Sequence, residues 1–354
     1  MGDKGKLAIY WAASCGGCEI SILAINEKIL QVAEAFDIVF CPCIMDAKVR
    51  DIEKMDDRTI DVCLFNGAIR TSEQEYMAHL LRQKSKVLVA FGSCAQEGGI
   101  PGLGNLTNAR EIFETAYNAA GDGSAGPTTP STDNPDLVTP LPEVTLPARA
   151  GQGPGDGQIT LTLPVFYDTV RTLAQTVPVD YFLPGCPPEA ARIWDAVTAI
   201  LSGQLPPPGS VIGAEKTCCD ECTRKRNEKK IKKFLRTWQV MPDAETCLLE
   251  QGLFCCGPAT REGCGALCPQ VNAPCLGCYG PNAGVEDFGA RMMSALASVI
   301  DSQDPREIER IIQEGIPDPV GSLYRFSLPN SLLRRAALIP DQERVELPLP
   351  KTTA

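Results

Sequence analysis

Three apolar runs in this chain lead directly into cysteine motifs. The runs are residues 7–11, 87–91 and 179–183, and the cysteines that follow them are Cys15, Cys18, Cys94 and Cys186. If the runs are neighbouring parallel strands, their carboxyl ends meet at one crevice, where open α/β sheets bind their ligands. Four thiolates would then surround one site, which is the ligand number of an iron-sulfur cluster or of a closed zinc site.

Residues 1 to about 120 alternate between strand-like and helix-like patterns. After Cys18, apolar residues recur every three or four positions from Ile22 to Phe36, as on the buried face of a helix. Further strands are predicted at 37–45 and 61–69, and residues 72–75 have the spacing of a helix capping box. Strands that alternate with helices predict right-handed crossovers and a doubly wound parallel sheet.

Residues 121–158 interrupt this alternation. They are rich in Gly, Pro, Thr, Ser and Asp, which predicts an insertion or a long irregular loop. Beyond them we expect the sheet to resume with a strand at 159–165, a short helix near 167–175, the strand before Cys186, and a helix from about 188 to 201. The proline run at 205–209 predicts a linker between a first domain, residues 1–205, and a second, residues 206–354.

The second predicted domain carries ten of the seventeen cysteines, all between residues 214 and 280. They include two C-x-x-C pairs, Cys219 with Cys222 and Cys275 with Cys278, set among glycines and prolines. This segment has little continuous apolar pattern, so we expect bound metal to supply much of its stability. Helices are predicted at 285–300 and 304–314, before an irregular, proline-rich end.

Composition excludes several classes of protein. The net charge of −11 argues against nucleic acid as the main partner. The first residues lead directly into a strand-like run, so we expect no secretory leader, and we find no apolar stretch long enough to span a membrane. So many cysteines without a leader predict reduced, metal-binding thiols, not a disulfide scaffold. We therefore expect a cytoplasmic metalloprotein.

Together these motifs resemble those of the small subunits of nickel-iron hydrogenases. The resemblance is carried by the first C-x-x-C, by G-S-C with G-G-I-P-G after it, by P-G-C-P-P, and by the cysteine-rich second domain. Within that family, the sequence is most similar to the gamma subunits of the cytoplasmic methyl-viologen-reducing (non-deazaflavin-reducing) type, found in methanogens and their relatives. The resemblance extends over residues 6 to about 300.

The resemblance implies a flavodoxin-like α/β domain, followed by a largely irregular iron-sulfur domain with C-terminal helices. It also implies three 4Fe-4S clusters. By motif and by order along the chain, the ligands are Cys15, Cys18, Cys94 and Cys186 for the proximal cluster, Cys264, Cys268, Cys275 and Cys278 for the medial cluster, and Cys219, Cys222, Cys247 and Cys255 for the distal cluster. Respiratory small subunits usually have a histidine and a proline where this chain has Cys219 and Cys268, which favours three full four-cysteine clusters. Cys218 and Cys256 stand beside two of these ligands and leave both choices open.

The expected role is electron transfer. The sequence has no visible acid-base pair, nucleophilic triad or nickel site, so we expect that this chain does not itself split hydrogen. The resemblance implies that electrons from H2 oxidation in a separate large subunit pass through the three clusters. They would leave to a 2Fe-2S or ferredoxin-like adaptor subunit and a heterodisulfide reductase. Small subunits of deazaflavin-reducing or NAD(P)-linked hydrogenases share these motifs and are alternatives.

Two further alternatives belong to other classes. The related subunit of quinone-linked complex I has two adjacent cysteines where this chain has Cys15 and Cys18, and it lacks a domain with eight further ligands. A zinc-stabilised scaffold without a redox role is the other, because four-thiolate sets suit zinc as well.

The remaining candidate residues have simpler interpretations. The cysteines outside the three sets are expected in the core or in loops, and they are Cys41, Cys43, Cys63, Cys218 and Cys256. His79 is predicted to be structural, and Glu19 to be a helix-start carboxylate that the helix dipole favours. Glycines 98 and 99 are expected to let the backbone approach a cluster. The basic run at 224–236 predicts a solvated helix face or a docking surface for an acidic partner.

Overall fold

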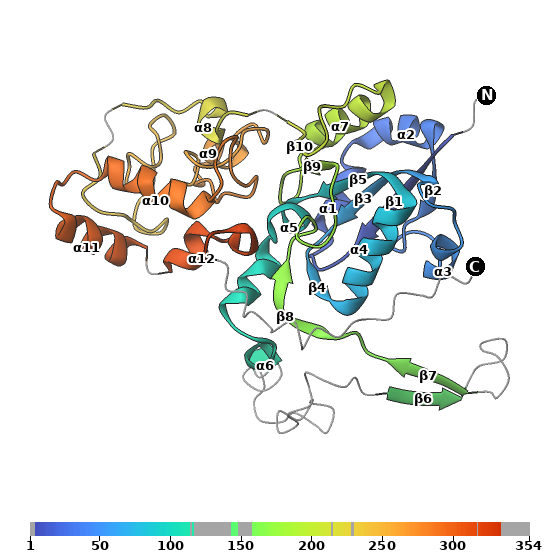
Figure 1. Cartoon of the computed structure of the whole chain (residues 1–354). Coiled ribbons are helices and arrows are strands. Elements are labelled where there is room, and N and C mark those ends of the chain that lie inside the picture. Colours follow the sequence, from blue (N-terminus) through green and yellow to red (C-terminus); the bar gives the residue numbers. More distant parts are fainter. Residues whose placement is uncertain are drawn as a thin grey trace.

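The structure is a computed structural model, which describes residues 4–113, 115–116, 143–147, 158–213, 215–227, 230–316 and 318–333. The insertion predicted at 121–158 lies outside the described residues except for 143–147 and 158, and so does the chain beyond residue 333. Figure 1 shows a sheet covered by helices and, beside it, a part in which short helices are joined by long irregular segments.

A six-stranded parallel sheet forms the first part, with the spatial order β10-β9-β5-β3-β1-β2. Its strands are β1 (Gly5–Trp11), β2 (Phe36–Phe40), β3 (Ile60–Asn66), β5 (Ser85–Phe91), β9 (Tyr181–Leu183) and β10 (Ser210–Val211). Counted along the chain, this order is 2-1-3-4-5 with one more strand at the edge. That is the flavodoxin-like order, so the predicted fold class is confirmed.

The central strands bury both of their faces, whereas the edge strands β2 and β10 are only partly buried. In β1, Leu7 and Ile9 belong to one apolar cluster, whereas Ala8 and Tyr10 belong to the cluster on the opposite face, as the two-residue period of a strand requires. The helices α1 (Gly17–Leu23), α2 (Ile29–Ala35) and α7 (Ala190–Ser202) cover the first face, and α3 (Val49–Glu53) and α4 (Ser72–Lys84) cover the second. The sheet is thus the middle layer of three, and α7 agrees with the helix predicted at 188–201.

Some predicted boundaries are wrong by a few residues. The single helix predicted from Ile22 to Phe36 is divided into α1, the short 3-10 turn η1 (Asn26–Lys28) and α2. Phe36 already has an extended backbone and pairs with Gly5, so β2 begins there and ends at Phe40. The strand predicted to continue to residue 45 stops because the amides of Ile44 and Met45 fold back onto the Cys41 carbonyl.

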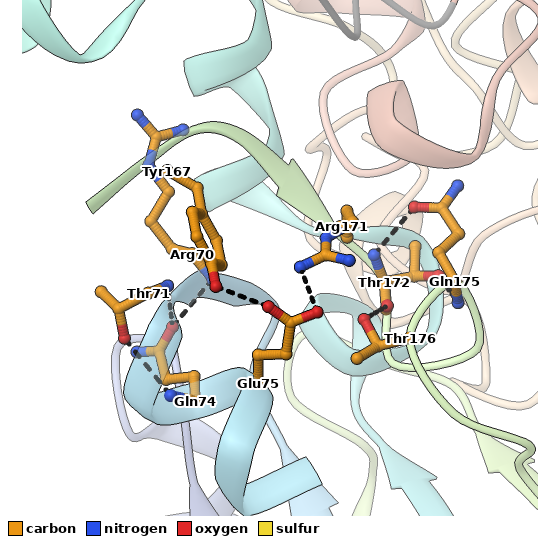
Figure 2. Close-up of polar contacts among 9 residues, drawn as sticks. All are labelled: Arg70, Thr71, Gln74, Glu75, Tyr167, Arg171, Thr172, Gln175 and Thr176. Atoms are coloured by element: carbon orange, nitrogen blue, oxygen red, sulfur yellow. Dashed lines mark hydrogen bonds and ion pairs between the residues drawn. The ribbon is translucent and has the colours of Figure 1, made fainter. Parts of the chain in front are cut away.

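The capping box lies one residue earlier than predicted, at Thr71. The Thr71 hydroxyl accepts a bond from the Gln74 amide at 3.3 Å, and the Gln74 side chain accepts one from the Thr71 amide at 3.1 Å (Figure 2). The hydroxyl of Ser72 instead accepts a bond from the Val165 amide at 2.9 Å. Residue 71 is thereby the N-cap of α4, and residue 72 connects this helix to the segment that ends at Val165.

The predictions for 159–175 are wrong. Residues 158–162 do not rejoin the main sheet but form β7 (Gln158–Thr162), which pairs antiparallel with β6 (Glu143–Pro147). Residues near 167 form the strand β8 (Phe166–Arg171), not a helix, and β8 pairs antiparallel with β4 (Ile69–Thr71). Long-range polar contacts stabilise β8. Glu75 of α4 accepts a hydrogen bond from the Tyr167 hydroxyl at 2.5 Å and forms an ion pair with Arg171 at 2.8 Å (Figure 2).

The second part has its own core. Its helices are α8 (Cys218–Glu221), α9 (Leu267–Gln270), α10 (Phe288–Val299), α11 (Pro305–Gly315) and α12 (Pro319–Leu323), with the 3-10 turn η5 (Leu328–Asn330). The predicted helices at 285–300 and 304–314 are thus confirmed as α10 and α11, but residues 319–330 are not irregular as expected. Apolar residues of α10 and α12 surround buried cysteines of this part, so the core combines helix faces with thiols.

The chain leaves the main sheet only after β10. The strand β10 follows the proline run and pairs with β9. The segment at 205–209, predicted as a linker between domains, therefore connects α7 with a strand of the main sheet. The domain division at residue 205 stays a prediction. None of the helices in the described ranges has the length and apolar character that crossing a bilayer requires.

Candidate iron-sulfur sites

The four cysteines of the predicted proximal site follow three strands of the main sheet. Cys15 and Cys18 lie at the start of α1 after β1, Cys94 lies in α5 (Ser93–Glu97) directly after β5, and Cys186 follows β9. The strands are not all neighbours, because β3 lies between β1 and β5. The expectation that their carboxyl ends meet still applies, since parallel strands end at the same edge of the sheet.

Mutual electrostatic effects indicate that these four thiols lie close together. Burial and then the charges of Cys94, Glu19, Cys186 and Cys15 raise the pKa of Cys18. The pKa of Cys94 is raised to about 12, mainly by burial and to a smaller extent by the charges of Cys186 and Cys15. Burial and, to a smaller extent, the charge of Cys15 also raise the pKa of Cys186. Four such thiolates repel one another, so holding them all ionised requires positive charge among them, which a metal centre supplies.

Two glycines bring backbone directly against the sulfurs. A side chain at Gly92, where φ is +85°, would collide with the Cys18 sulfur, and a Cβ atom at Gly99 would lie 2.5 Å from the Cys94 sulfur. Both positions therefore require glycine. That Gly99 lets the backbone approach a cluster stays a prediction, whereas Gly98 is explained by Pro329 of η5, with which a side chain at Gly98 would collide.

Sequence reasoning missed Asn66, which ends β3 at the same edge of the sheet. Its side chain is fully buried, and its Nδ2 donates to both carboxylate oxygens of Glu19, at 2.7 and 2.8 Å, and to the Ser14 hydroxyl at 2.9 Å. Glu19 does lie in the first turn of α1, as expected. The pair Asn66-Gly67 after an apolar strand is a turn signal that could have marked this position.

The predicted medial cysteines also act on one another. Burial and then the charges of Cys275, Cys264, Cys186 and Cys268 raise the pKa of Cys278. This group therefore contains all four predicted medial cysteines and reaches Cys186 of the proximal set. The Ser93 hydroxyl, next to Cys94, donates to the Cys278 carbonyl, which joins the two sets through the backbone.

Cys218 lies among the medial cysteines and not with Cys219. Its thiol is 1% exposed, and hydrogen bonds with Cys264 and Cys275 are the main causes that raise its pKa. The same bonds lower the pKa of Cys264 and lower that of Cys275 to about 7, because a thiol that donates to a thiolate stabilises the ionised form. Cys256 is fully buried, and its burial, followed by the charges of Cys275 and Cys255, raises its pKa.

Cys219 and Cys255 of the predicted distal set both lie next to Gly257. A Cβ atom there would be 3.0 Å from the Cys219 sulfur and 3.8 Å from the Cys255 sulfur. The Cys275 amide donates to the Cys255 sulfur at 3.3 Å, so this pair also adjoins the medial set. Burial is the main cause that raises the pKa of Cys255 to about 12.

The other two predicted distal cysteines are positioned through the backbone. The Cys247 amide donates to the Lys225 carbonyl at 2.9 Å, which brings Cys247 near the segment that follows Cys222. Both side chains pack, partly buried, against the core of the second part. Across the described ranges, no three Cys, His, Asp or Glu side chains stand as close together as the ligands of a single metal ion.

The basic run near this set is not the helix that the sequence predicts. Its described residues are irregular, and Arg224 is buried, where its guanidinium donates to the carbonyls of Pro269, Asp243 and Thr246 at 2.7–2.9 Å. Arg224 therefore stabilises the loops that carry the cysteines. The basic residues that remain exposed include Lys225, Lys232 and Lys233.

Comparison with known proteins gives the family. The chain is 39% identical over 336 residues to the F420-non-reducing hydrogenase iron-sulfur subunit of Archaeoglobus profundus, covering 93% of this chain and 98% of that protein. It is 36% identical to the corresponding vhu subunit of the F420-non-reducing hydrogenase of Methanocaldococcus jannaschii, over 94% and 98% of the two chains. The chain belongs to this family of hydrogenase subunits. It is therefore a component of an oxidoreductase complex.

More distant matches cover less of this hydrogenase subunit. The family profile described as NADH ubiquinone oxidoreductase, 20 Kd subunit, matches residues 15–200 and thus the part that holds the proximal set. The delta subunit of the NAD-reducing hydrogenase HoxS of Cupriavidus necator is 22% identical over 57% of this chain and 80% of that protein. The profile ends before the cysteine-rich part, whereas the matches to F420-non-reducing hydrogenases extend over it.

Proposed function

We propose that this chain is the electron-transfer subunit of a nickel-iron hydrogenase of the F420-non-reducing type, in which twelve cysteines hold three 4Fe-4S clusters. The observation that carries the proposal is the continuity of the three thiol sets. Ser93 joins the proximal to the medial set through Cys278, and the amide of Cys275 joins the medial to the distal set through Cys255. Such a row is the arrangement that stepwise electron transfer requires.

When bound, a 4Fe-4S cluster accepts and gives up one electron, at a potential set by hydrogen bonds, charge and burial. The residues of this chain supply each of these influences. Amide donors reach the sulfurs, as from Gly17 to Cys15 at 3.4 Å, and buried ligands such as Cys18 and Cys94 exclude water. Asn66 and Glu19 fix the start of α1 and with it the positions of Cys15 and Cys18.

A large subunit would bind at the proximal end, where exposed apolar side chains support this proposal. They lie at the end of β1 or on the segments that follow β1, β2 and β5, and they are Trp11 (45% exposed), Ile20 (70%), Leu23 (64%), Ile44 (72%) and Ile100 (47%). Isolated exposed apolar residues are ordinary, but several of them around one edge indicate an interaction surface.

At the distal end, the exposed residues support an acidic electron acceptor. Trp238 is 78% and Met241 is 89% exposed, and the exposed Lys232 and Lys233 lie on the same segment. Apolar anchors with surrounding lysines suit an acidic protein. We propose a 2Fe-2S or ferredoxin-like adaptor subunit at this end, followed by a heterodisulfide reductase.

Metal analysis of anaerobically purified protein tests the proposal. We expect about twelve iron atoms and equal acid-labile sulfide per chain, since each four-cysteine set holds four iron atoms. Zinc in place of iron would overturn the proposal and favour a zinc-stabilised scaffold.

A pair of cysteine variants tests the ligand assignment. Cys94→Ser should remove or alter the proximal electron paramagnetic resonance signal and leave the other two. Cys63→Ser is the matched control, because Cys63 is buried within β3 and lies in none of the three sets. Unchanged spectra in the Cys94 variant would remove Cys94 from the ligands.

A further inference from the structure

Glu97 is a buried carboxyl group that adjoins segments of both the proximal and the medial set. It ends α5, three residues after Cys94, and it is 5% exposed. Gly280, two residues after Cys278, packs against its side chain, and a Cβ atom there would lie 3.3 Å from the Glu97 Cγ. Figure 1 shows α5 at the junction of the two parts of the molecule.

Neutral side chains hold the Glu97 carboxyl. Asn330 Nδ2 donates to Oε2 at 3.0 Å, and Gln96 Nε2 donates to Oε1 at 3.3 Å. The positive charge of the buried Arg261 favours the ionised form of Glu97. Arg261 also interacts with the charges of Glu215 and Glu262. The positive charge is thus divided among three carboxyl groups. Burial outweighs these favourable influences and raises the pKa of Glu97 to about 7.

An open cleft of about 530 Å³ connects Glu97 with solvent. Its lining includes Gln96, Arg261, Asn282 and the exposed Glu286 and Leu332. Within the described structure, the side-chain oxygens of Gln96 and Asn282 are buried without a hydrogen-bond partner. Polar atoms of this kind in a roomy polar cleft are satisfied by water. A proton can therefore pass between solvent and the Glu97 carboxyl along this cleft.

We propose that Glu97 is a proton-binding residue whose charge is coupled to the electrons that occupy the proximal and medial sites. The inference rests on the proposed function. An electron added at either site adds negative charge next to the segments that hold Glu97, namely α5 after Cys94 and the backbone after Cys278, and this charge disfavours the ionised carboxylate. The carboxylate then takes one proton from water in the cleft as the electron arrives, and returns that proton when the electron moves on.

Potentiometric titration of the holoprotein between pH 5.5 and 8.5 tests this coupling. We expect the proximal and medial potentials to fall as pH rises around 7, by at most 59 mV per pH unit, the value for one proton per electron. In Glu97→Gln both potentials should be independent of pH in this range. Glu286→Gln, which alters an exposed carboxyl of the same cleft, should keep the wild-type slope, and the distal potential should not change.

If Glu97→Gln fails to assemble, infrared spectroscopy of the wild type tests the same coupling. Reduction of the wild-type holoprotein should produce the infrared band of a protonated carboxyl group, and its absence would overturn the inference. An equal slope in Glu97→Gln would do the same. Potentials that do not vary with pH in a fully loaded wild type contradict the role of Glu97 alone. A wild type without iron contradicts the proposed function instead.

Discussion

Replacing Gly92 by alanine should remove the proximal cluster without changing any proposed ligand. Gly92 has φ +85° and ψ 164°, a backbone region that is nearly exclusive to glycine and costs other residues of order 1–3 kcal/mol. The added methyl group would also overlap the Cys18 sulfur, and overpacking of this kind typically costs about 1–3 kcal/mol more. Together these effects destabilise the site by about 2–6 kcal/mol, unless Cys18 moves away from the other three thiols.

Iron content and denaturant unfolding of the anaerobic protein measure this effect. Gly92→Ala should lose about four iron atoms per chain, which is one cluster, and the proximal signal with them. Gly203→Ala is the matched control: Gly203 also has positive φ, at +67°, but a Cβ atom there meets nothing within 4 Å. It should lose only about 1–2 kcal/mol of stability and keep all its iron.

Full iron content and an unchanged proximal signal in Gly92→Ala would refute this reasoning. The same holds if Gly203→Ala loses as much iron as Gly92→Ala, because the loss would then follow from backbone strain anywhere in the chain and not from contact with Cys18.

Three further predictions concern stability. Thr71→Ala removes the acceptor for the Gln74 amide and should cost about 1 kcal/mol of unfolding free energy; an unchanged denaturation midpoint would exclude a capping role. Gly289→Ala lies within α10, where alanine normally stabilises a helix by about 1 kcal/mol, but its methyl group would overlap the Tyr324 ring, so the midpoint should fall. Between pH 4.5 and 7, folded Glu97 keeps a proton that the unfolded chain releases, because its pKa is raised to about 7. Unfolding free energy should therefore fall as pH rises through this window, by at most about 3 kcal/mol, and Glu97→Gln should lose this dependence.

Local patterns in the sequence were sufficient for the strands that precede the cysteines, but not for the edge strand β10, which lies beyond the predicted domain boundary. The apolar runs that became β1, β5 and β9 carry their cysteines at their carboxyl ends, and parallel strands bring such ends to one edge. The capping signal near residue 72 was also local, and it was misplaced by one residue because the Ser72 hydroxyl bonds to Val165. No local pattern shows that Val165 lies there.

Long-range pairing decided the segments where prediction failed. Residues 166–171 form a strand because β4 offers a partner and Glu75 binds both Tyr167 and Arg171. The position of β3 between β1 and β5 also follows from pairing in space, and it brings Asn66 to Glu19. These contacts join residues tens of positions apart, so short-range periodicity carries no trace of them.

Apolar runs that end in cysteines are enough to predict a parallel α/β sheet with thiols at its edge and a second, cysteine-rich part. Which of two adjacent cysteines faces which set depends on how the chain packs in space. Cys218 and Cys219 begin α8, and successive residues of a helix point about 100° apart, so one meets Cys264 and Cys275 while the other meets Cys255. Packing of the two parts against each other likewise brings Glu97 into contact with Gly280.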